Sequence, residues 1–146
     1  MKKVIVLVIV VMAVLAGCAE VDLGSGVSEN TVEPNTETVL IDNDVVKVTY
    51  LEIFETNGFC YLRLKVANKT DKQISVYLVD AYVNDMAVTM MSGVPMDIAP
   101  GKMSQNPFIF SGFTKDAVEK IEFKVHVCDE NMDTIEENDT VEVRLK

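Results

Sequence analysis

Apolar and polar residues alternate with a period of two in short runs from residue 39 to the end of the chain. The run over residues 59–67 places four apolar side chains on one face, namely Cys60, Leu62, Leu64 and Val66. The run over residues 121–128 does the same with Ile121, Phe123, Val125 and Val127. Strict alternation is typical of β-strands that bury one face, so both runs are predicted to be strands. Shorter runs predict further strands over residues 46–50, 74–78 and 140–145.

Turn residues separate these runs about every ten positions. Asn57-Gly58 lies between two apolar runs, which is the strongest short-range signal for a β-hairpin. Asn84-Asp85 predicts a second tight hairpin, and Ala99-Pro100-Gly101 predicts a turn into a strand over residues 103–110. Pro107 within that strand predicts an edge or a bulge, because proline cannot donate a hydrogen bond to a neighbouring strand.

The spacing of the strands favours one β-sandwich domain. About seven short strands within residues 39–146 predict two packed antiparallel sheets, and a closed barrel is the alternative. No helical pattern lies between the strands, which argues against a parallel α/β sheet. One short helical turn is predicted over residues 115–120, before the penultimate strand, with Thr114 as its N-cap.

The first 17 residues have the layout of a signal peptide. Two lysines precede an unbroken apolar run over residues 4–16. The run ends in Leu15-Ala16-Gly17-Cys18, which resembles the lipobox of bacterial lipoproteins. The resemblance implies cleavage before Cys18 and a diacylglyceryl thioether on its thiol. Cys18 is therefore the expected lipidation site, and the expected location is the extracytoplasmic face of a bacterial cell membrane.

Two other interpretations of this segment are weaker. A transmembrane helix needs roughly 20 apolar residues, whereas only the 16 residues from 4 to 19 lack a charge, and Glu20 follows directly. An ordinary secretory signal fits poorly, because Val14-Leu15-Ala16 is not a good A-x-A-like cleavage site. Two acyl chains are also the number that stable membrane anchoring requires.

The charge of the mature chain restricts its partners. Removing residues 1–17 takes away two of the 13 basic residues and none of the 23 acidic ones, so the formal charge becomes −12. This argues against nucleic acid, whose binding needs clustered Lys and Arg. It also argues against the body of the domain lying flat on an anionic leaflet. A soluble domain on a lipid tether fits this charge, and the sequence leaves its oligomeric state open.

Residues 18–38 separate the signal peptide from the sandwich. They mix Gly, Ser, Pro, Asn and Glu, contain no aromatic residue and hold only isolated apolar residues. Such a composition buries too little surface to fold, so a flexible acidic linker of about 25 Å is predicted. The predicted organisation is a lipoprotein signal peptide over residues 1–17, the lipidated cysteine with its linker over residues 18–38, and the sandwich over residues 39–146.

Several strand and turn phrases give the domain a family resemblance. They are D-N-D-V-V-K-V-T-Y at 42–50, L-R-L-K-V-A-N-K-T-D-K at 62–72, V-N-D at 83–85, I-A-P-G-K at 98–102 and K-I-E-F at 120–123. With the lipobox and the acidic linker, they resemble small surface lipoproteins of Gram-positive bacteria that carry a single immunoglobulin-like domain of unknown function. The resemblance covers residues 39–146 and implies an all-β, immunoglobulin-like antiparallel β-sandwich, but no activity. That family usually has Asn-Gly where this chain has Asn84-Asp85.

Cys60 and Cys128 remain after the anchor, in strands that would be B and F of an immunoglobulin-like domain, where a disulfide is common. Alternation argues against a bond. Cys60 shares a face with Leu62, which should point inward, whereas Cys128 shares a face with Lys124 and His126, which should point outward. Cys60 lies at the start of its strand, whereas Cys128 lies at the end of its own. Because strands B and F of this fold run roughly parallel, the two cysteines should lie further apart than the roughly 7 Å between Cα atoms that a disulfide spans. We expect both thiols to be free.

Seven carboxylates and no basic residue lie within residues 129–142: Asp129, Glu130, Asp133, Glu136, Glu137, Asp139 and Glu142. Clustered oxygen ligands suit a hard cation such as Ca²⁺. The EF-hand spacing fails, because Thr134 and Thr140 stand where that loop needs glycine and glutamate. A solvated acidic hairpin is the simpler interpretation.

Five methionines lie close together in the sequence: Met86, Met90, Met91, Met96 and Met103. They are candidates for a soft-metal site or an adaptable binding surface. Core filling together with some exposed strand positions is the simpler interpretation. Aromatic residues are few, and the candidates for exposed positions on strands are Tyr61, Tyr77 and Tyr82.

The sequence contains no nucleophile–base pair, no G-x-S-x-G motif and no glycine-rich phosphate loop, so we expect no enzyme, no catalytic residue and no cofactor. We expect a membrane-anchored extracytoplasmic lipoprotein whose non-catalytic immunoglobulin-like domain binds a protein or another envelope component through its edges and loops. The alternative is a lipoprotein that binds a cation or a small ligand through the acidic 129–142 hairpin or the Met86–Met103 segment.

Overall fold

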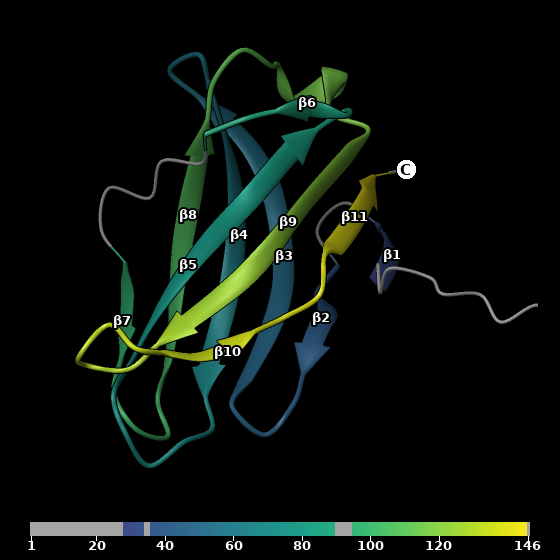
Figure 1. Cartoon of the computed structure of the whole chain (residues 1–146). Coiled ribbons are helices and arrows are strands. Elements are labelled where there is room, and N and C mark those ends of the chain that lie inside the picture. Colours follow the sequence, from purple (N-terminus) through teal and green to yellow (C-terminus); the bar gives the residue numbers. More distant parts are fainter. Residues whose placement is uncertain (1–27, 34–35, 90–94, 146) are drawn as a thin grey trace, which may run out of the picture.

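Two β-sheets pack face to face and form most of the molecule. The computed structural model describes residues 28–33, 36–89 and 95–145. Sheet A contains β1 (Ser28–Val32), β5 (Ile74–Val83), β6 (Met86–Ala87), β7 (Met96–Ile98), β9 (Lys120–Cys128), β10 (Thr134–Glu137) and β11 (Val141–Leu145). Sheet B contains β2 (Thr38–Asp42), β3 (Val46–Thr56), β4 (Phe59–Asn68) and β8 (Met103–Phe110). Figure 1 shows β5 and β9 crossing in front of β3 and β4, so the core lies between the two layers.

The strand order confirms the predicted all-β, immunoglobulin-like sandwich. Sheet A has the order β1-β11-β9-β5-β6, with β10 on β9 and β7 on β5, and sheet B has the order β2-β3-β4-β8. The described chain has eleven strands rather than about seven, because several strands of two to five residues are too short to show alternation. The predicted helical turn is the 3₁₀ helix η1 (Lys115–Ala117). Two strands follow β9 rather than one, so η1 does not precede the penultimate strand.

Period-two alternation determines which side chains fill the core. The four apolar residues predicted to point inward from β4 are all buried, and so are the four from β9. β3 contributes Val46, Val48 and Tyr50, and β8 contributes Phe108 and Phe110. At about 25 cal/mol per Å² of apolar surface removed from water, this contiguous cluster is the main stabilising term of the fold.

The predicted hairpins form with the backbone conformations that their sequences favour. Asn57 (φ 52°) and Gly58 (φ 76°) are both left-handed, as a two-residue type I′ turn requires between β3 and β4. Asn84 (φ 48°) and Asp85 (φ 64°) do the same between β5 and β6, so Asp serves here in place of Gly. Pro107 lies on β8, which is an edge strand of sheet B, as predicted.

β1 corrects the predicted start of the domain. Residues 28–32 belong to the segment predicted to be a flexible linker, yet they pair in parallel register with β11, from Ser28 beside Val141 to Val32 beside Leu145. The side chain of Val32 is fully buried in the core. The sequence of β1 shows no alternation of apolar and polar residues. Val32 is its buried apolar side chain, and the strand is held by its pairing with β11. Residues 18–27 of the predicted linker lie outside the described residues.

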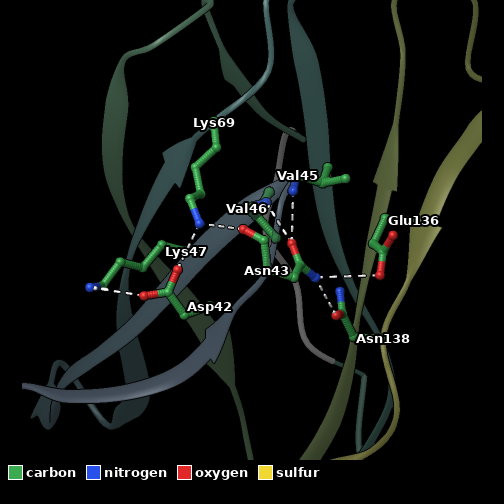
Figure 2. Close-up of polar contacts among 8 residues, drawn as sticks. All are labelled: Asp42, Asn43, Val45, Val46, Lys47, Lys69, Glu136 and Asn138. Atoms are coloured by element: carbon green, nitrogen blue, oxygen red, sulfur yellow. Dashed lines mark hydrogen bonds and ion pairs between the residues drawn. The ribbon is translucent and has the colours of Figure 1, made fainter.

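A polar cluster joins the two sheets at one end of the sandwich (Figure 2). Asn43, in the turn between β2 and β3, accepts hydrogen bonds at Oδ1 from the backbone amides of Val45 and Val46, both at 2.9 Å. Its Nδ2 group donates to Asn138 Oδ1 at 3.0 Å and to Glu136 Oε1 at 3.4 Å. Asn138 follows β10, so one asparagine side chain shapes a turn of sheet B and holds it against sheet A.

Candidate binding face

The outer face of sheet B exposes large apolar side chains from three of its four strands. Val39 on β2 is 45% exposed, Phe59 on β4 is 43% exposed and Met103 on β8 is 67% exposed. The other exposed large apolar residues of the described chain belong to sheet A or its turns, namely Tyr82 on β5, Met86 on β6, Met132 between β9 and β10, and Ile135 on β10. Exposed apolar surface on one face of a sheet is a feature of binding surfaces.

Four planar groups stand in a row on this outer face. Phe54 of β3 is directly opposite Tyr61 of β4, and their rings stack with centroids 4.8 Å apart and an interplanar angle of 6°. The Arg63 guanidinium carbon lies 4.5 Å from the centroid of the Phe54 ring, as in a cation–π contact. Arg63 also pairs with the carboxylate of Glu52, its partner across the β3–β4 ladder. The contacts fix four side chains that would otherwise be mobile, which lowers the entropy cost of binding on this surface.

A hollow of about 350 Å³ continues the same face toward the other end of sheet B. It is lined by residues of all four strands and by Glu37, just before β2, the full set being Glu37, Val39, Lys47, Thr49, Lys65, Ala67 and Met103. Its surface is mainly apolar, and its size lies at the lower end of the range of small-molecule sites, about 300–1,000 Å³. The outer face of sheet B therefore combines a row of stacked side chains with an apolar depression.

Lysines and their carboxylate partners form the rim of the hollow. Lys65 Nζ lies 2.6 Å from Glu37 Oε2. Asp42 is shared between two lysines, with Lys47 Nζ at 3.1 Å and Lys69 Nζ at 2.8 Å (Figure 2). Hydrogen bonds from Lys69 and then Lys47 hold the pKa of Asp42 below its ordinary value. Lys47, which lines the hollow, thus shares one carboxylate with Lys69, which does not line it.

The outer face of sheet A also carries ion pairs, and several of them share Lys120. Lys120 contacts the carboxylate of Asp85 and lies 3.3 Å from that of Glu122 and 4.0 Å from that of Glu142. The hydrogen bond to Asp85, followed by the one to Glu122, raises the pKa of Lys120. Glu142 is itself buried, with Arg144 Nε 2.5 Å from its Oε1 atom. A network of ion pairs therefore covers this part of sheet A.

The acidic 129–142 segment does not gather its carboxylates around one point. Asp129 Oδ1 accepts hydrogen bonds from the backbone amides of Asn131 and Asp133, at 2.8 and 3.0 Å. Glu136 contacts Asn43, and Glu137 lies 3.8 Å from Lys124. Within the described ranges, no group of three or more His, Cys, Asp or Glu side chains is placed to hold a metal ion.

The methionines of the Met86–Met103 segment lie on different elements. Met86 is exposed on β6, Met96 is buried on β7 and Met103 is exposed on β8. Met90 and Met91 lie outside the described residues, as does Cys18. Of the described methionines of this segment, Met103 is the one that contributes to the candidate face.

Both strand cysteines are free thiols, as expected. Cys60 is in the core, where its Sγ donates to the Phe113 carbonyl oxygen at 3.2 Å, and burial, with a smaller contribution from Glu55, raises the pKa of the Cys60 thiol. The expectation that Cys128 points to solvent was wrong, since only 3% of it is exposed. Cys128 is paired with a strand on each side, opposite residues of β5 and β10, and the strand that covers it at 134–137 was not predicted.

Sequence reasoning named Tyr61 but missed Phe54 and Arg63 as its neighbours. The signal was present, because a two-residue Asn57-Gly58 hairpin fixes the register of the strands that flank it. That register places Phe54 opposite Tyr61 and Glu52 opposite Arg63. The hollow has no comparable signal, since it depends on the pairing of β2 and β8 with the central strands.

Comparison with known proteins gives likenesses of fold only. No protein family and no curated protein matches the chain. The GAE domain of GGA2p from Saccharomyces cerevisiae is similar in structure, with a TM-score of 0.48, 19% identity and coverage of 76% of this chain and 98% of that chain. A FixG-related protein from Vibrio parahaemolyticus has a TM-score of 0.43 and 21% identity, over 70% of this chain and 96% of that one. The immunoglobulin-like assignment therefore rests on the strand order itself. In the described part of the chain, no helix has the length and apolar character to cross a membrane.

Proposed function

We propose that this protein is a lipid-anchored extracytoplasmic binding module, attached through Cys18, that binds an envelope component with the outer face of sheet B and catalyses no reaction. The observation that carries the proposal is the set of apolar side chains that β2, β4 and β8 expose to solvent from sheet B, namely Val39, Phe59 and Met103. The leader and lipobox at residues 1–18 support the anchor.

Two properties of the face favour binding over a purely structural role. Leaving large apolar side chains in water is unfavourable, and a partner that covers them recovers about 25 cal/mol per Å² before association costs. The Glu52–Arg63–Phe54–Tyr61 row offers a charged and aromatic surface that is already ordered. Aromatic and arginine side chains are the residues most enriched at the energetic centres of interfaces.

The anchor is tested by changing its one predicted attachment point. Wild-type protein should fractionate with membranes and carry a diacylglyceryl mass increment on Cys18, because two acyl chains give stable attachment. A Cys18→Ala chain should lack the increment and accumulate as uncleaved precursor. A wild-type mature protein without the increment would overturn the anchor.

The binding face is tested with paired exposed methionines. The mature domain is immobilised and used to capture components from a cell-envelope extract of the source bacterium. Met103→Ser, on sheet B, should reduce capture of the specific component at least fivefold. Met132→Ser serves as the matched control, because Met132 has a similar exposure, 59%, and lies in the turn between β9 and β10. Equal loss with the two variants, or loss with Met132→Ser alone, would contradict the assignment of the face.

A further inference from the structure

We propose that the hollow on the outer face of sheet B binds a small single-tailed anionic amphiphile, with an aliphatic body on the apolar floor and a carboxylate at the lysine rim. The inference rests on the proposed function, since it names a ligand class for the same face. It concerns only the depression lined by Val39, Lys47, Lys65, Ala67 and Met103 with their neighbours Glu37 and Thr49.

The floor of the hollow fits an aliphatic group. Val39, Ala67 and Met103 contribute methyl, methylene and thioether surface from β2, β4 and β8. Met103 and Ala67 are partners across the β4–β8 ladder, and Ala67 is also opposite Lys47 of β3, so the small Ala67 side chain makes a low point between longer ones. A methionine adapts its shape to the ligand because its side chain is unbranched and has three rotatable bonds.

The rim of the hollow favours an anion over a cation. Lys47 and Lys65 line it, and their ammonium groups are held by carboxylates that are easily displaced. The Glu37 side chain is 63% exposed, so a ligand carboxylate can replace it at Lys65 at little cost. At Lys47, Asp42 is the one carboxylate of the described residues within ion-pair distance, and Lys69 also uses it. A ligand carboxylate beside Lys47 would pair with Lys47 and leave Asp42 to pair with Lys69.

The distribution of charge over the sandwich makes sheet B less unfavourable for an anion than sheet A. The strands of sheet B carry three basic and three acidic residues, namely Lys47, Arg63, Lys65, Asp42, Glu52 and Glu55. The strands of sheet A carry three basic and seven acidic residues, namely Lys120, Lys124, Arg144, Glu29, Asp80, Asp97, Glu122, Glu136, Glu137 and Glu142. Long-range repulsion therefore disfavours an anion on sheet A relative to sheet B.

The test uses the mature chain, residues 18–146, with Cys18→Ser so that it stays in solution with every described residue present. Decanoate below its micellar concentration is the probe, and its dissociation constant is measured by NMR titration of backbone amides. We expect saturable shifts that centre on β2, β3, β4 and β8 around the hollow. Decyltrimethylammonium, which has the same tail and the opposite charge, should bind at least tenfold more weakly.

Lys65→Gln and Met103→Ser should each weaken decanoate binding about fivefold or more, because one removes a rim cation and the other removes floor surface. The matched controls are Lys124→Gln and Met86→Ser, which make the same changes on sheet A and should stay within twofold of the parent chain. Both pairs lie at positions that are not fully buried, so the fold is retained.

Three results would overturn the inference. They are the absence of saturable binding, equal affinity for the cationic amphiphile, and equal weakening by the sheet A controls. Binding to vesicles of anionic phospholipid without binding to decanoate would also overturn it, since it would indicate a membrane surface rather than a single-tailed ligand. If decanoate fails while Met103→Ser still abolishes envelope capture, the ligand class is wrong and the binding face stands.

Discussion

Asn43 Nδ2 and Asn138 Oδ1 are 3.0 Å apart and form a hydrogen bond between the two sheets of the sandwich (Figure 2). The bond joins the β2–β3 turn to the segment that follows β10, 95 residues later in the chain. Asn138 is held in place by its own backbone, which donates to the Val125 carbonyl oxygen at 3.1 Å. The contact closes one end of the sandwich, beside the lysine rim of the hollow.

Asn43→Ala should destabilise the domain by about 2 kcal/mol in urea unfolding, because the change removes one acceptor for two backbone amides and one donor to two oxygens. Asn138→Ala should cost about 1 kcal/mol, and the double variant should show a coupling of about 0.5–1 kcal/mol. Asn131→Ala, at an exposed position in the β9–β10 turn, is the control and should stay within about 0.5 kcal/mol. Additive effects of Asn43→Ala and Asn138→Ala would show that the sheets are not joined here.

A domain that starts at residue 39 should be less stable than one that starts at residue 28, since it lacks β1 and the buried Val32 side chain. Removing the valine alone, as Val32→Ala, should cost about 1.5–2.5 kcal/mol by lost burial and a residual cavity. Val39→Ala is the matched control, because that valine is 45% exposed and should change stability by less than about 0.5 kcal/mol. Equal stability of the two lengths in urea would mean that β1 does not belong to the folded unit.

Asp42 predicts a specific pH dependence. Its pKa is lower in the folded chain than its ordinary value of 3.8, because Lys69 and Lys47 stabilise the carboxylate. The stabilisation is therefore complete above that ordinary value and is lost as the pH falls through the lower, folded pKa. Asp42→Asn should have a lower Tm than wild type at pH 7, and the difference should shrink below about pH 3.8, when followed by circular dichroism. Added salt should reduce the difference at pH 7, since the pairs are exposed.

Asp44→Asn is the control for this pH dependence, because Asp44 is an exposed carboxylate in the same turn. It should give a Tm difference that is small at every pH. A difference between Asp42→Asn and wild type that grows as the pH falls would have the wrong sign for a depressed pKa and would contradict the assignment.

Millimolar Ca²⁺ should leave the Tm unchanged and give no saturable heat in calorimetry. Asp129 is committed to amides of its own turn, Glu136 contacts an asparagine, and Glu137 faces Lys124, so the oxygens point to different partners. A calcium site would need several of them to turn toward one point. A saturable rise in Tm that disappears in Asp129→Asn would restore the cation-binding alternative.

Local sequence patterns predicted the strands and turns whose structure depends on residues that are close together in the chain. Alternation over residues 59–67 and 121–128 assigned the core faces of β4 and β9, and Asn57-Gly58 assigned a hairpin whose register then places Phe54 on Tyr61. The sequence did not predict the strands that form only by pairing with a strand elsewhere in the chain. β1 forms because β11 is beside it, and β10 covers Cys128 because β9 provides an edge for it.

The same division applies to the candidate site. The stacked row follows from the register of one hairpin, so it could have been predicted from the sequence. The hollow depends on the pairing of four strands, which the sequence does not predict. The net charge of −10 gave no sign of this face, because it sums over an acidic sheet A and a nearly neutral sheet B.

The most direct test of the binding face is photocrosslinking of the full-length protein in intact cells. A photoreactive phenylalanine analogue replaces either Phe59, on the outer face of sheet B, or Tyr82, on sheet A, two aromatic positions with 43% and 41% exposure. The proposal predicts that the crosslinker at position 59 yields a discrete adduct that Met103→Ser reduces at least fivefold, while position 82 yields none. A discrete adduct from position 82 alone, or equal adducts from both positions, would contradict the assignment of the binding face to sheet B.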